Sequence, residues 1–167
     1  LAVKSKVLAP SLLSGDGTLV FETINQTDDP RKVWVYPRAL RRVLRSPLFG
    51  YEIPGTSSDN LRTVDDFGLY NGPPDRYDWQ LLGKREIYIP YNAYNLHGPQ
   101  LDDSNIVRTG HINPEHARYE LHRVWVVEGV LKADARHIYS RRVFFMDEDS
   151  WQIAVADSYN MDGELWR

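Results

Sequence analysis

The sequence predicts a mainly β protein with a minor helical part, built around a curved antiparallel sheet. Short segments that are rich in β-branched and aromatic residues alternate apolar with polar positions, which is the pattern of half-buried strands. Clusters of Gly, Pro, Asn and Asp separate these segments and provide turns. The segment Arg118–Leu131 is about twice as long as the usual strand of five or six residues, and a strand of that length favours a sheet that curves.

The alternation defines the strands in chain order. Two acidic runs, Asp28-Asp29-Pro30 and Asp147-Glu148-Asp149-Ser150, have the composition of tight turns, so the strands on either side of each run should be antiparallel. The three strands between Arg118 and Ser158 are the most regular and predict a meander. The expected strands are Thr18–Ile24, Lys32–Tyr36, Arg41–Arg45, Trp79–Ile89, Arg118–Leu131, Arg136–Met146, Trp151–Ser158 and a last one from Glu164.

Two long stretches that are rich in Pro and Gly predict loops with short helices. In the first, Ser57-Ser58-Asp59 can cap a helix that places Leu61, Val64 and Phe67 on one side. In the second, Asn113-Pro114-Glu115 combines a cap residue, a Pro at the first helical position and an acid at the positive end of the helix dipole. Loops of this length usually cover something or have a function.

Length and composition indicate one folded domain over residues 1–167. Hydrophobic residues make up 42% and charged residues 26% of the chain, an ordinary globular composition. The net charge of −3 gives no general attraction to nucleic acid. The longest apolar run, Val124–Val127, is far shorter than the roughly 20 residues of a membrane-spanning helix, so we expect a chain that is peripheral to a membrane at most. No signal peptide is recognisable, and both ends suggest an internal segment of a longer secreted protein.

The residues that carry common catalytic chemistry form no recognisable constellation. Cysteine is absent, which excludes disulfides, thiolate metal sites and cysteine nucleophiles. The sequence contains no nucleophile elbow, no phosphate-binding Gly-rich loop and no dinucleotide fingerprint. We therefore expect no catalytic residue, no cofactor and no enzyme activity. The least favoured alternative is an enzyme that acts on a glycan or lipid with Asp65 and Asp66.

The histidines and the paired acids leave a metal site open but disfavoured. The spacing of His111, His116 and His122 matches no compact ligand motif, and satisfied or surface histidines are the preferred interpretation. Paired acids could bind calcium or perform glycoside chemistry, but each pair lies where a turn or a helix cap already favours Asp. No metal is expected. The remaining histidines are His97 and His137, and the acidic groups are Asp28-Asp29, Asp65-Asp66, Asp102-Asp103 and Asp147-Glu148-Asp149.

A local excess of positive charge follows the second predicted strand. Arg41, Arg42 and Arg45 lie close together there, and they could dock against lipid headgroups or an acidic partner protein. An equally good explanation is a solvated edge strand whose charges discourage sheet-to-sheet aggregation.

Aromatic residues concentrate on the predicted strands. On the longest strand, Trp125 and Val127 share one face, and Val124 and Val126 share the other. Because both faces are partly apolar, either the sheet is covered on both sides or one face lines a cavity for a hydrophobic ligand. Core packing remains the alternative for each of these residues alone. The expected ligand-binding residues are Trp34, Tyr36, Trp79, Trp125, Val127, Phe144 and Trp151.

Nine runs of the sequence resemble a bacterial family of unknown function, domain of unknown function 1329, which is usually labelled as related to outer-membrane lipoprotein-sorting proteins. The resemblance covers nearly the whole chain from Gly15 onward, and family members are longer than this sequence. The chain departs from the family at Tyr36-Pro37-Arg38-Ala39, where the family usually has Tyr-Asn-Pro-Gly, so the form of that turn is open. The runs are Gly17–Phe21, Asp28–Tyr36, Arg41–Val43, Pro54–Asp59, Asn71–Trp79, Tyr88–Asn92, Arg118–Glu128, Arg136–Tyr139 and Asp147–Ile153.

The resemblance implies a fold similar to the Lol lipoprotein carriers, an antiparallel sheet that is open like a half-barrel with short helices over its concave mouth. It also implies a periplasmic location and association with exporters of the resistance-nodulation-division type, and it supplies no catalytic residues. The main hypothesis is therefore a periplasmic, non-catalytic carrier module for a lipid or another hydrophobic molecule. The alternative is a structural or assembly subunit of an envelope or exporter complex that docks through Arg41, Arg42 and Arg45.

Overall fold

The computed structural model describes residues 1–46, 52–55 and 58–167. The chain divides into two compact units, each made of two stretches of sequence. Unit 1 comprises Leu1–Tyr77 and Lys132–His137, and unit 2 comprises Asp78–Leu131 and Ile138–Arg167. The expectation that residues 1–167 fold as one domain stays a prediction. None of the helices in the described ranges has the length and apolar character that crossing a membrane requires.

Unit 1 contains a four-stranded antiparallel sheet in the order β1-β2-β3-β4. Val33 at its centre is 1% exposed, whereas the neighbouring Trp34 is only half-buried. Because successive side chains of a strand point to opposite faces, the sheet buries the face that carries Val33 and leaves the face of Trp34 more open. The strands are β1 (Ala2–Lys6), β2 (Gly17–Phe21), β3 (Lys32–Tyr36) and β4 (Leu44–Arg45).

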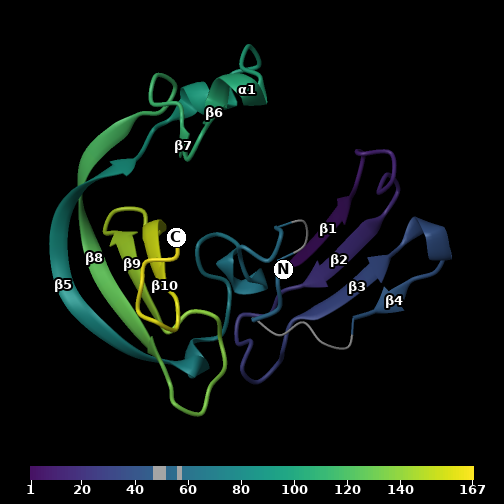
Figure 1. Cartoon of the computed structure of the whole chain (residues 1–167), viewed down its shortest axis with the longest axis horizontal. Coiled ribbons are helices and arrows are strands. Elements are labelled where there is room, and N and C mark those ends of the chain that lie inside the picture. The colour runs from purple at the N-terminus through teal and green to yellow at the C-terminus, as the bar shows by residue number, and fades with distance from the viewer. Residues whose placement is uncertain (47–51, 56–57) are drawn as a thin grey trace. The chain divides into compact units, whose positions relative to one another are not determined.

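Unit 2 contains a second four-stranded sheet in the order β10-β9-β8-β5. Its two longest strands, β5 (Tyr77–Pro90) and β8 (Tyr119–Leu131), have 14 and 13 residues. Both bend along their length, so the sheet is strongly curved (Figure 1). The strands β9 (Arg141–Asp147) and β10 (Ile153–Tyr159) continue the sheet as antiparallel neighbours of β8.

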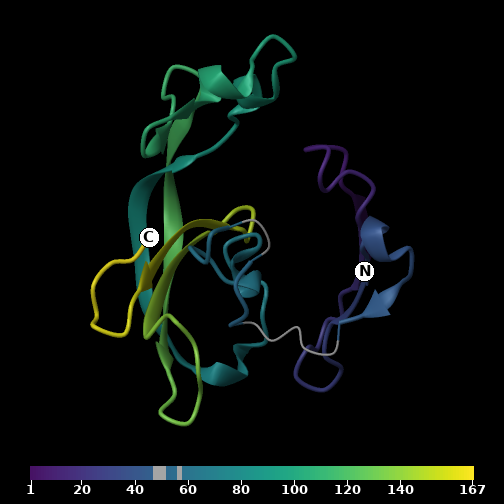
Figure 2. The same ribbon diagram turned by 45° about the vertical axis from the view of Figure 1, so that its right-hand side comes forward.

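The other elements of the described residues are short. The strands β6 and β7 form a two-stranded ribbon. Together with the helix α1, this ribbon lies beyond the ends of β5 and β8 in both ribbon views (Figures 1 and 2). The short elements, in full, are the 3-10 turns η1 (Arg38–Leu40), η2 (Val64–Asp66), η3 (Pro74–Arg76) and η4 (Tyr94–His97), the helix α1 (Asp103–Ile106), and the strands β6 (Val107–Arg108) and β7 (His111–Ile112).

The predicted fold class is confirmed. The described residues are mainly β, with antiparallel pairing, few helices and open sheets that end in edge strands. The meander predicted between Arg118 and Ser158 is present as β8, β9 and β10. The turn Asp147-Glu148-Asp149-Ser150 connects β9 to β10, and the Asp147 carboxylate accepts hydrogen bonds from the backbone N–H and the hydroxyl of Ser150. The strands lie in two sheets, whereas the sequence suggested one.

Some predicted strands differ from the structure. The strand expected over Arg41–Arg45 is limited to β4, because Arg41 adopts the left-handed conformation (φ 48°) at the end of η1. The strand expected from Arg136 begins only at Arg141, because residues up to His137 belong with unit 1. The expected last strand is reduced to one isolated bridge between Tyr159 and Leu165. The strands β1, β6 and β7 were not predicted.

The two predicted helices are also shorter than expected. Ser57 lies outside the described residues, and in the segment after it helical backbone is confined to η2, where Thr63 and Asp66 form a capping box. Asn113 acts as the expected cap, because its Oδ1 accepts the N–H of Glu115, but only a turn follows. A first helical turn fixes many dihedral angles for a single hydrogen bond, so capping residues alone do not extend a helix here.

Candidate functional site

An open hollow of about 720 Å³ lies on the Trp34 face of the unit 1 sheet. Strand register places Lys4, Leu19, Trp34 and Arg45 in one row across the four strands. Because directly paired residues project to the same side, Leu19 and Trp34 form an apolar centre with a cation on each edge strand. The apolar side chains that line the hollow from this face are Leu19, Phe21, Trp34, Tyr36 and Val43.

Gly17 gives the hollow its depth. It pairs with Lys6 on β1 and with Tyr36 on β3, so it occupies the middle of the next row on the same face. A Cβ at this position would lie 3.6 Å from the carbonyl oxygen of Ser5 and 3.8 Å from the Cβ of Tyr36, which are ordinary contacts. The φ of Gly17 is outside the left-handed range. The strand would therefore accept a larger residue, and glycine leaves that space open.

The aromatic lining is held in place but remains accessible. The rings of Phe21 and Trp34 meet edge to face, with centroids 5.3 Å apart and planes at 78°, a favoured aromatic geometry. The guanidinium of Arg45 lies 5.9 Å from the centre of the Trp34 ring. Phe21 is 41% and Tyr36 is 37% exposed. Exposed apolar surface of this kind is available for a ligand to cover.

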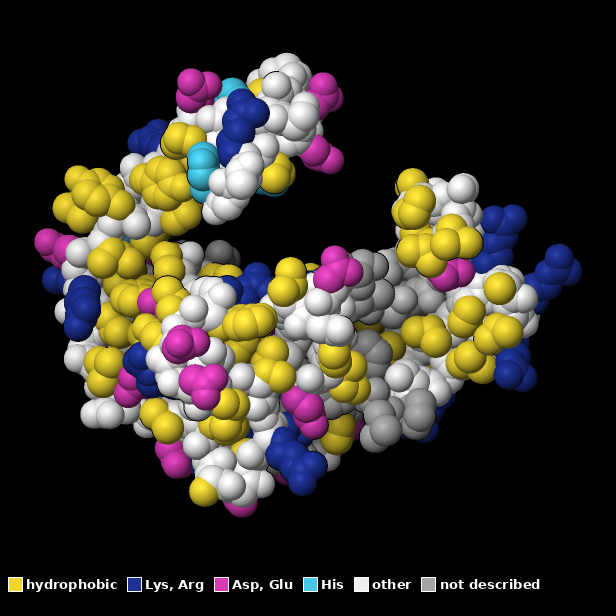
Figure 3. All heavy atoms as spheres, viewed as in Figure 1, with side chains coloured by type: hydrophobic (Ala, Val, Ile, Leu, Met, Phe, Trp, Pro, Cys, Tyr) yellow, Lys and Arg dark blue, Asp and Glu magenta, His cyan; other side chains and the backbone are white. Residues whose placement is uncertain are grey.

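Cations belong to the lining of the hollow. These are Lys4, Lys6 and Arg38, and no Asp or Glu among the described residues belongs to it. The guanidinium of Arg38 donates to the carbonyl oxygen of Ser14 at 3.0 Å, and its backbone N–H donates to a carboxylate oxygen of Asp16 at 2.8 Å. In the space-filling view, hydrophobic side chains gather over the part of the chain that holds β1 to β4, with Lys and Arg at its rim (Figure 3). The hollow thus combines an apolar lining with a positive rim.

The other predicted ligand-binding residues lie mostly in unit 2. Val127 pairs with Phe144 across β8 and β9, and the Trp79 ring lies 6.0 Å from that of Phe144. Phe144 is 2% exposed and Trp79 is 36% exposed, so this group is part core and part surface. The structure therefore brings Trp79, Val127 and Phe144 together on one face of this sheet.

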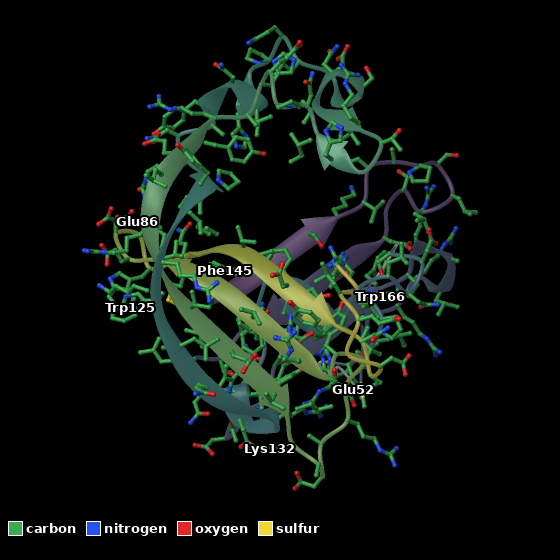
Figure 4. The ribbon with its side chains drawn as sticks, turned by 60° about the vertical axis from the view of Figure 1, so that its left-hand side comes forward. Glu52, Glu86, Trp125, Lys132, Phe145 and Trp166 are labelled. Atoms are coloured by element: carbon green, nitrogen blue, oxygen red, sulfur yellow. The ribbon has the colours of Figure 1, made fainter. Side chains whose placement is uncertain are left out.

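Trp125 belongs to the same face of the unit 2 sheet, because it pairs with Met146, while Phe145 pairs with Val126 on the opposite face. Figure 4 labels Trp125 and Phe145 on these two neighbouring strands. The ammonium of Lys84 lies 4.1 Å from the centre of the Trp125 ring and 2.6 Å from a carboxylate oxygen of Glu148. The Lys84 ammonium, which forms an ion pair with Glu148, therefore covers part of the Trp125 ring.

Trp151 and the predicted docking arginines lie in turns or at a sheet edge. Trp151 follows the β9–β10 turn with a positive φ of 58° and is 67% exposed; the strand predicted to start there begins two residues later, at Ile153. Arg41 and Arg42 are exposed, and neither forms an ion pair with any residue in the described part of the chain. Arg45 is the one member of the arginine group beside Trp34.

A polar cluster that the sequence did not reveal lies where β9 ends and the β9–β10 turn begins. Nδ1 of His122 is 2.8 Å from Oδ1 of Asp147, and the His122 ring lies against Tyr91 with centroids 4.2 Å apart. The hydrogen bond to Asp147 raises the pKa of His122, and partial burial opposes this only in part. Burial alone would raise the pKa of Asp147, but hydrogen bonds from Ser150 and His122 outweigh it and lower that pKa.

This cluster has the residue types of a catalytic triad without its geometry. Ser150 donates its hydroxyl to Asp147, whereas a triad needs the nucleophile to contact the histidine. His122, Asp147 and Asp149 each offer one ligand atom, and these atoms lie within 4.8 Å of one another. Both Asp147 oxygens, however, already accept hydrogen bonds within the protein. The expectation of no metal stays a prediction.

The acid pair of the least favoured enzyme hypothesis has structural partners. Asp65 is 2% exposed, accepts a hydrogen bond from the Thr63 hydroxyl and lies 3.2 Å from Nε2 of His137. Asp66 accepts the backbone N–H of Thr63. The two carboxylates therefore bind different partners within unit 1.

Lys4 and Lys6 are site residues that the sequence pattern did not reveal. They belong to β1, whose five residues are all exposed, and a short exposed strand with two Lys carries a weak hydrophobic signal. One hint of a strand is the alternation along this segment, in which Ala2, Lys4 and Lys6 would face one side and Val3 and Ser5 the other. Only the register with β2 places these lysines beside Leu19 and Gly17.

Comparisons with known proteins identify relatives of the chain. Uncharacterized protein PA3922 of Pseudomonas aeruginosa is 55% identical over 164 residues, which are 98% of this chain and 36% of that protein. The chain thus spans about a third of the length of this relative. The whole of residues 1–167 matches the family described as "Protein of unknown function (DUF1329)".

Two solved structures share the fold. A domain from Vibrio parahaemolyticus, assigned to an outer membrane lipoprotein-sorting protein, has a TM-score of 0.55 at 17% identity. A DUF1329 family protein from Desulfovibrio piger has a TM-score of 0.52 at 20% identity. Each comparison covers 97% of this chain and 52% of the other. The family model matches all of residues 1–167, and the chain is 55% identical to the Pseudomonas protein. The chain therefore belongs to the DUF1329 family, as the nine runs of its sequence predict.

Proposed function

We propose that the chain is a non-catalytic module that binds a lipid or another hydrophobic molecule and carries it in the periplasm. The hollow on the unit 1 sheet is the proposed binding site. The observation behind this proposal is an apolar lining that includes Leu19 and Trp34, left open on a sheet whose opposite face buries Val33. Apolar surface that a protein leaves exposed in a concave place is typical of a ligand site.

The size of the hollow suits this role. Its volume of about 720 Å³ is within the range of about 300–1,000 Å³ that small-molecule sites have. Burial of an acyl chain contributes roughly 0.8 kcal/mol per methylene. Ten methylenes would then contribute about 8 kcal/mol, which corresponds to a Kd near 1 µM before the costs of association are subtracted. Burial alone can therefore retain a ligand without any chemical step.

The comparisons support a carrier more than an enzyme. One solved structure with the same fold is assigned to outer membrane lipoprotein sorting; that assignment is a property of the Vibrio protein, and we extend it to this chain as a proposal. On that basis we propose transport of a hydrophobic molecule across the periplasm. The proposed partner, an exporter of the resistance-nodulation-division type, comes from the resemblance of the sequence to its family and not from the Vibrio structure. Trp79, Trp125, Val127 and Phe144 on the unit 2 sheet and Trp151 after its β9–β10 turn remain proposed ligand-binding residues of unit 2 itself.

A second candidate function is an assembly subunit that docks through Arg41, Arg42 and Arg45. The observation that favours it is the exposure of Arg41 and Arg42 without an ion-pair partner in the described ranges. Charge reversal at these two positions should abolish capture of an envelope complex if docking is the function. Binding of hydrophobic probes should then be unaffected.

Filling the hollow tests the carrier proposal. Dodecanol, a neutral probe, is titrated into the purified protein while tryptophan fluorescence is recorded. We expect saturable binding that Gly17→Leu abolishes, because the new side chain occupies the hollow, and that Gly17→Ala weakens only slightly. Circular dichroism and the Tm report whether each variant is folded. Absence of probe binding, or unchanged binding by a folded Gly17→Leu variant, would contradict the proposal.

A further inference from the structure

We infer that the ligand of the hollow is an anionic amphiphile, whose carboxylate or phosphate head is bound by Lys4, Lys6 and Arg38 and whose apolar chain covers Leu19 and Trp34. This inference rests on the proposed function and adds the chemical class of the ligand. The observation that supports it is an apolar lining beside Lys4, Lys6 and Arg38, with no acid in the lining that the structure describes.

The cations gather at one end of the hollow. Lys6 pairs with Gly17 and therefore lies in the row of Tyr36. Arg38 reaches the same end, because its side chain lies against Gly15, and the N–H of Gly15 donates to the carbonyl oxygen of Val7, the residue after Lys6. Lys4 lies one row further along on the same face of β1. A single anionic head can thus contact side chains from β1 and from the segment after β3.

The apolar lining extends away from this positive end. Leu19 and Trp34 form the next row after Gly17 and Tyr36, and Phe21 follows one row later. The four residue-to-residue steps from Gly17 to Phe21 span about 13 Å along the strand, so the lining between these two residues is an elongated surface. An amphiphile with its head at Lys6 can place an extended chain along it. The long stems of Lys4 and Lys6 can contact the chain while their ammonium groups reach the head.

The protein's own acids do not neutralise these cations. In residues 1–46 there are eight Lys and Arg and four Asp and Glu, a net charge of +4 in a chain whose total is −3. Glu22 pairs with Arg31 at 2.8 Å and Asp29 pairs with Lys32 at 2.9 Å. Asp16 accepts the backbone N–H of Arg38 rather than its guanidinium. No residue in the described ranges forms an ion pair with Lys4 or Lys6.

An anionic ligand explains this charge pattern better than a neutral one does. A neutral hydrophobe that covers the hollow would take water from Lys6 and Arg38 and offer no charge in return, which is unfavourable. A carboxylate or phosphate would replace that water with charge-assisted hydrogen bonds. The positive rim therefore selects for an anionic head while the apolar lining supplies the affinity for the chain.

Three probes that share one dodecyl chain test the inference: dodecyl phosphate, dodecanol and dodecyltrimethylammonium. At low salt we expect dodecyl phosphate to bind the purified protein about tenfold more tightly than dodecanol, since exposed ion pairs contribute up to about 1 kcal/mol each. The cationic probe should bind most weakly. High salt should reduce the difference between the probes, because it screens exposed charges.

Charge-removing variants localise the effect. The double variant Lys4→Gln/Lys6→Gln should reduce the preference for dodecyl phosphate to about twofold and leave dodecanol binding unchanged. The matched control Arg85→Gln/Arg108→Gln removes the same charge from exposed positions of unit 2, outside the hollow, and it should keep the full preference. An equal loss in the control would show a general effect of net charge and overturn the inference.

Further outcomes separate the inference from the proposed function. Equal affinity of the wild-type protein for the anionic and neutral probes would overturn the inference and leave the carrier proposal standing. If none of the three probes binds, both the inference and the carrier proposal are wrong. If inorganic phosphate displaces dodecyl phosphate at equal concentration, the hollow is a simple anion site. If the protein sediments with phosphatidylglycerol vesicles but binds no monomeric probe, the hollow is a bilayer-docking surface. Either result would overturn the inference.

Discussion

Nδ1 of His122 on β8 lies 2.8 Å from a carboxylate oxygen of Asp147 at the end of β9. The other oxygen of Asp147 accepts both the backbone N–H and the hydroxyl of Ser150 in the turn that follows. Asp147, which is 1% exposed, therefore connects the long strand of unit 2 to the hairpin turn. This connection makes the stability of unit 2 depend on pH.

The contribution of this pair should be largest in mildly acidic solution. The pKa of His122 is raised above 6.5 in the folded protein, so its contribution is complete below pH 6.5 and is lost as the pH rises through the folded-state pKa. The pKa of Asp147 is lowered below 3.8, so its contribution is present above pH 3.8 and is lost as the pH falls through the folded-state pKa. Both contributions are present between these two values.

The variant His122→Gln tests this dependence. We expect the difference in Tm between the wild type and this variant to be greatest between pH 3.8 and 6.5. The pKa of folded-state Asp147 lies below this range and that of His122 above it, so both groups are ionised there. The difference should decrease on the alkaline side. Thermal unfolding across the pH range measures it. His97→Gln, at an exposed position, is the control and should follow the wild-type profile. A constant difference at all pH values would contradict this assignment.

Gly129 should not tolerate a side chain. A Cβ at this position would lie 2.9 Å from Cζ3 of Trp79, so Gly129→Ala must displace the Trp79 ring from its place beside Phe144. Overpacking of this kind costs about 1–3 kcal/mol. Urea denaturation measures the change, and a shift in tryptophan emission should accompany it.

Gly17→Ala is the matched control for Gly129→Ala. It also replaces a strand glycine, but its Cβ meets only ordinary contacts. Replacement of glycine where the backbone conformation is compatible stabilises a protein by about 0.4–1 kcal/mol, so this variant should be neutral or slightly more stable. Equal destabilisation by both substitutions would show that the Trp79 contact is not the cause.

Buried acids should matter for stability rather than for catalysis. Asp65→Ala removes the carboxylate that Thr63 and His137 contact in the interior of unit 1. Loss of a buried hydrogen-bond partner costs about 1–3 kcal/mol, which chemical denaturation can resolve. Asp28→Ala, which removes an exposed acid from a turn, should cost less. A stability equal to that of the wild type would contradict the structural role given to Asp65.

The sequence predicts strands well where alternation is long. The segments of β3, β5 and β8 carry repeated β-branched and aromatic residues, and their patterns match the structure to within a few residues. The strand β1 was missed because its five residues are all exposed and two of them are Lys. The left-handed backbone of Arg41 was also unpredictable, because an Arg gives no local sign of positive φ.

The candidate site depends on register, which the sequence does not contain. Trp34 and Tyr36 could be selected from their aromatic side chains alone. Lys4 and Lys6 become site residues only because β1 pairs with β2. For the same reason the sequence grouped Trp34 with Trp125, although they belong to different sheets in different units. Alternation assigns a residue to a face of a strand, but not a strand to a sheet.

The two faces of the unit 1 sheet should respond differently to the same substitution. Val33 is 1% exposed and Val43, which lines the hollow, is 63% exposed. Truncation of a buried valine removes packed methyl groups and leaves a cavity, so Val33→Ala should cost about 2 kcal/mol, whereas Val43→Ala should change the free energy of unfolding by less than about 0.5 kcal/mol. Urea denaturation of both variants measures these changes. If Val43→Ala were as destabilising as Val33→Ala, the hollow would be part of the folded core, and a ligand could not enter it without partial unfolding.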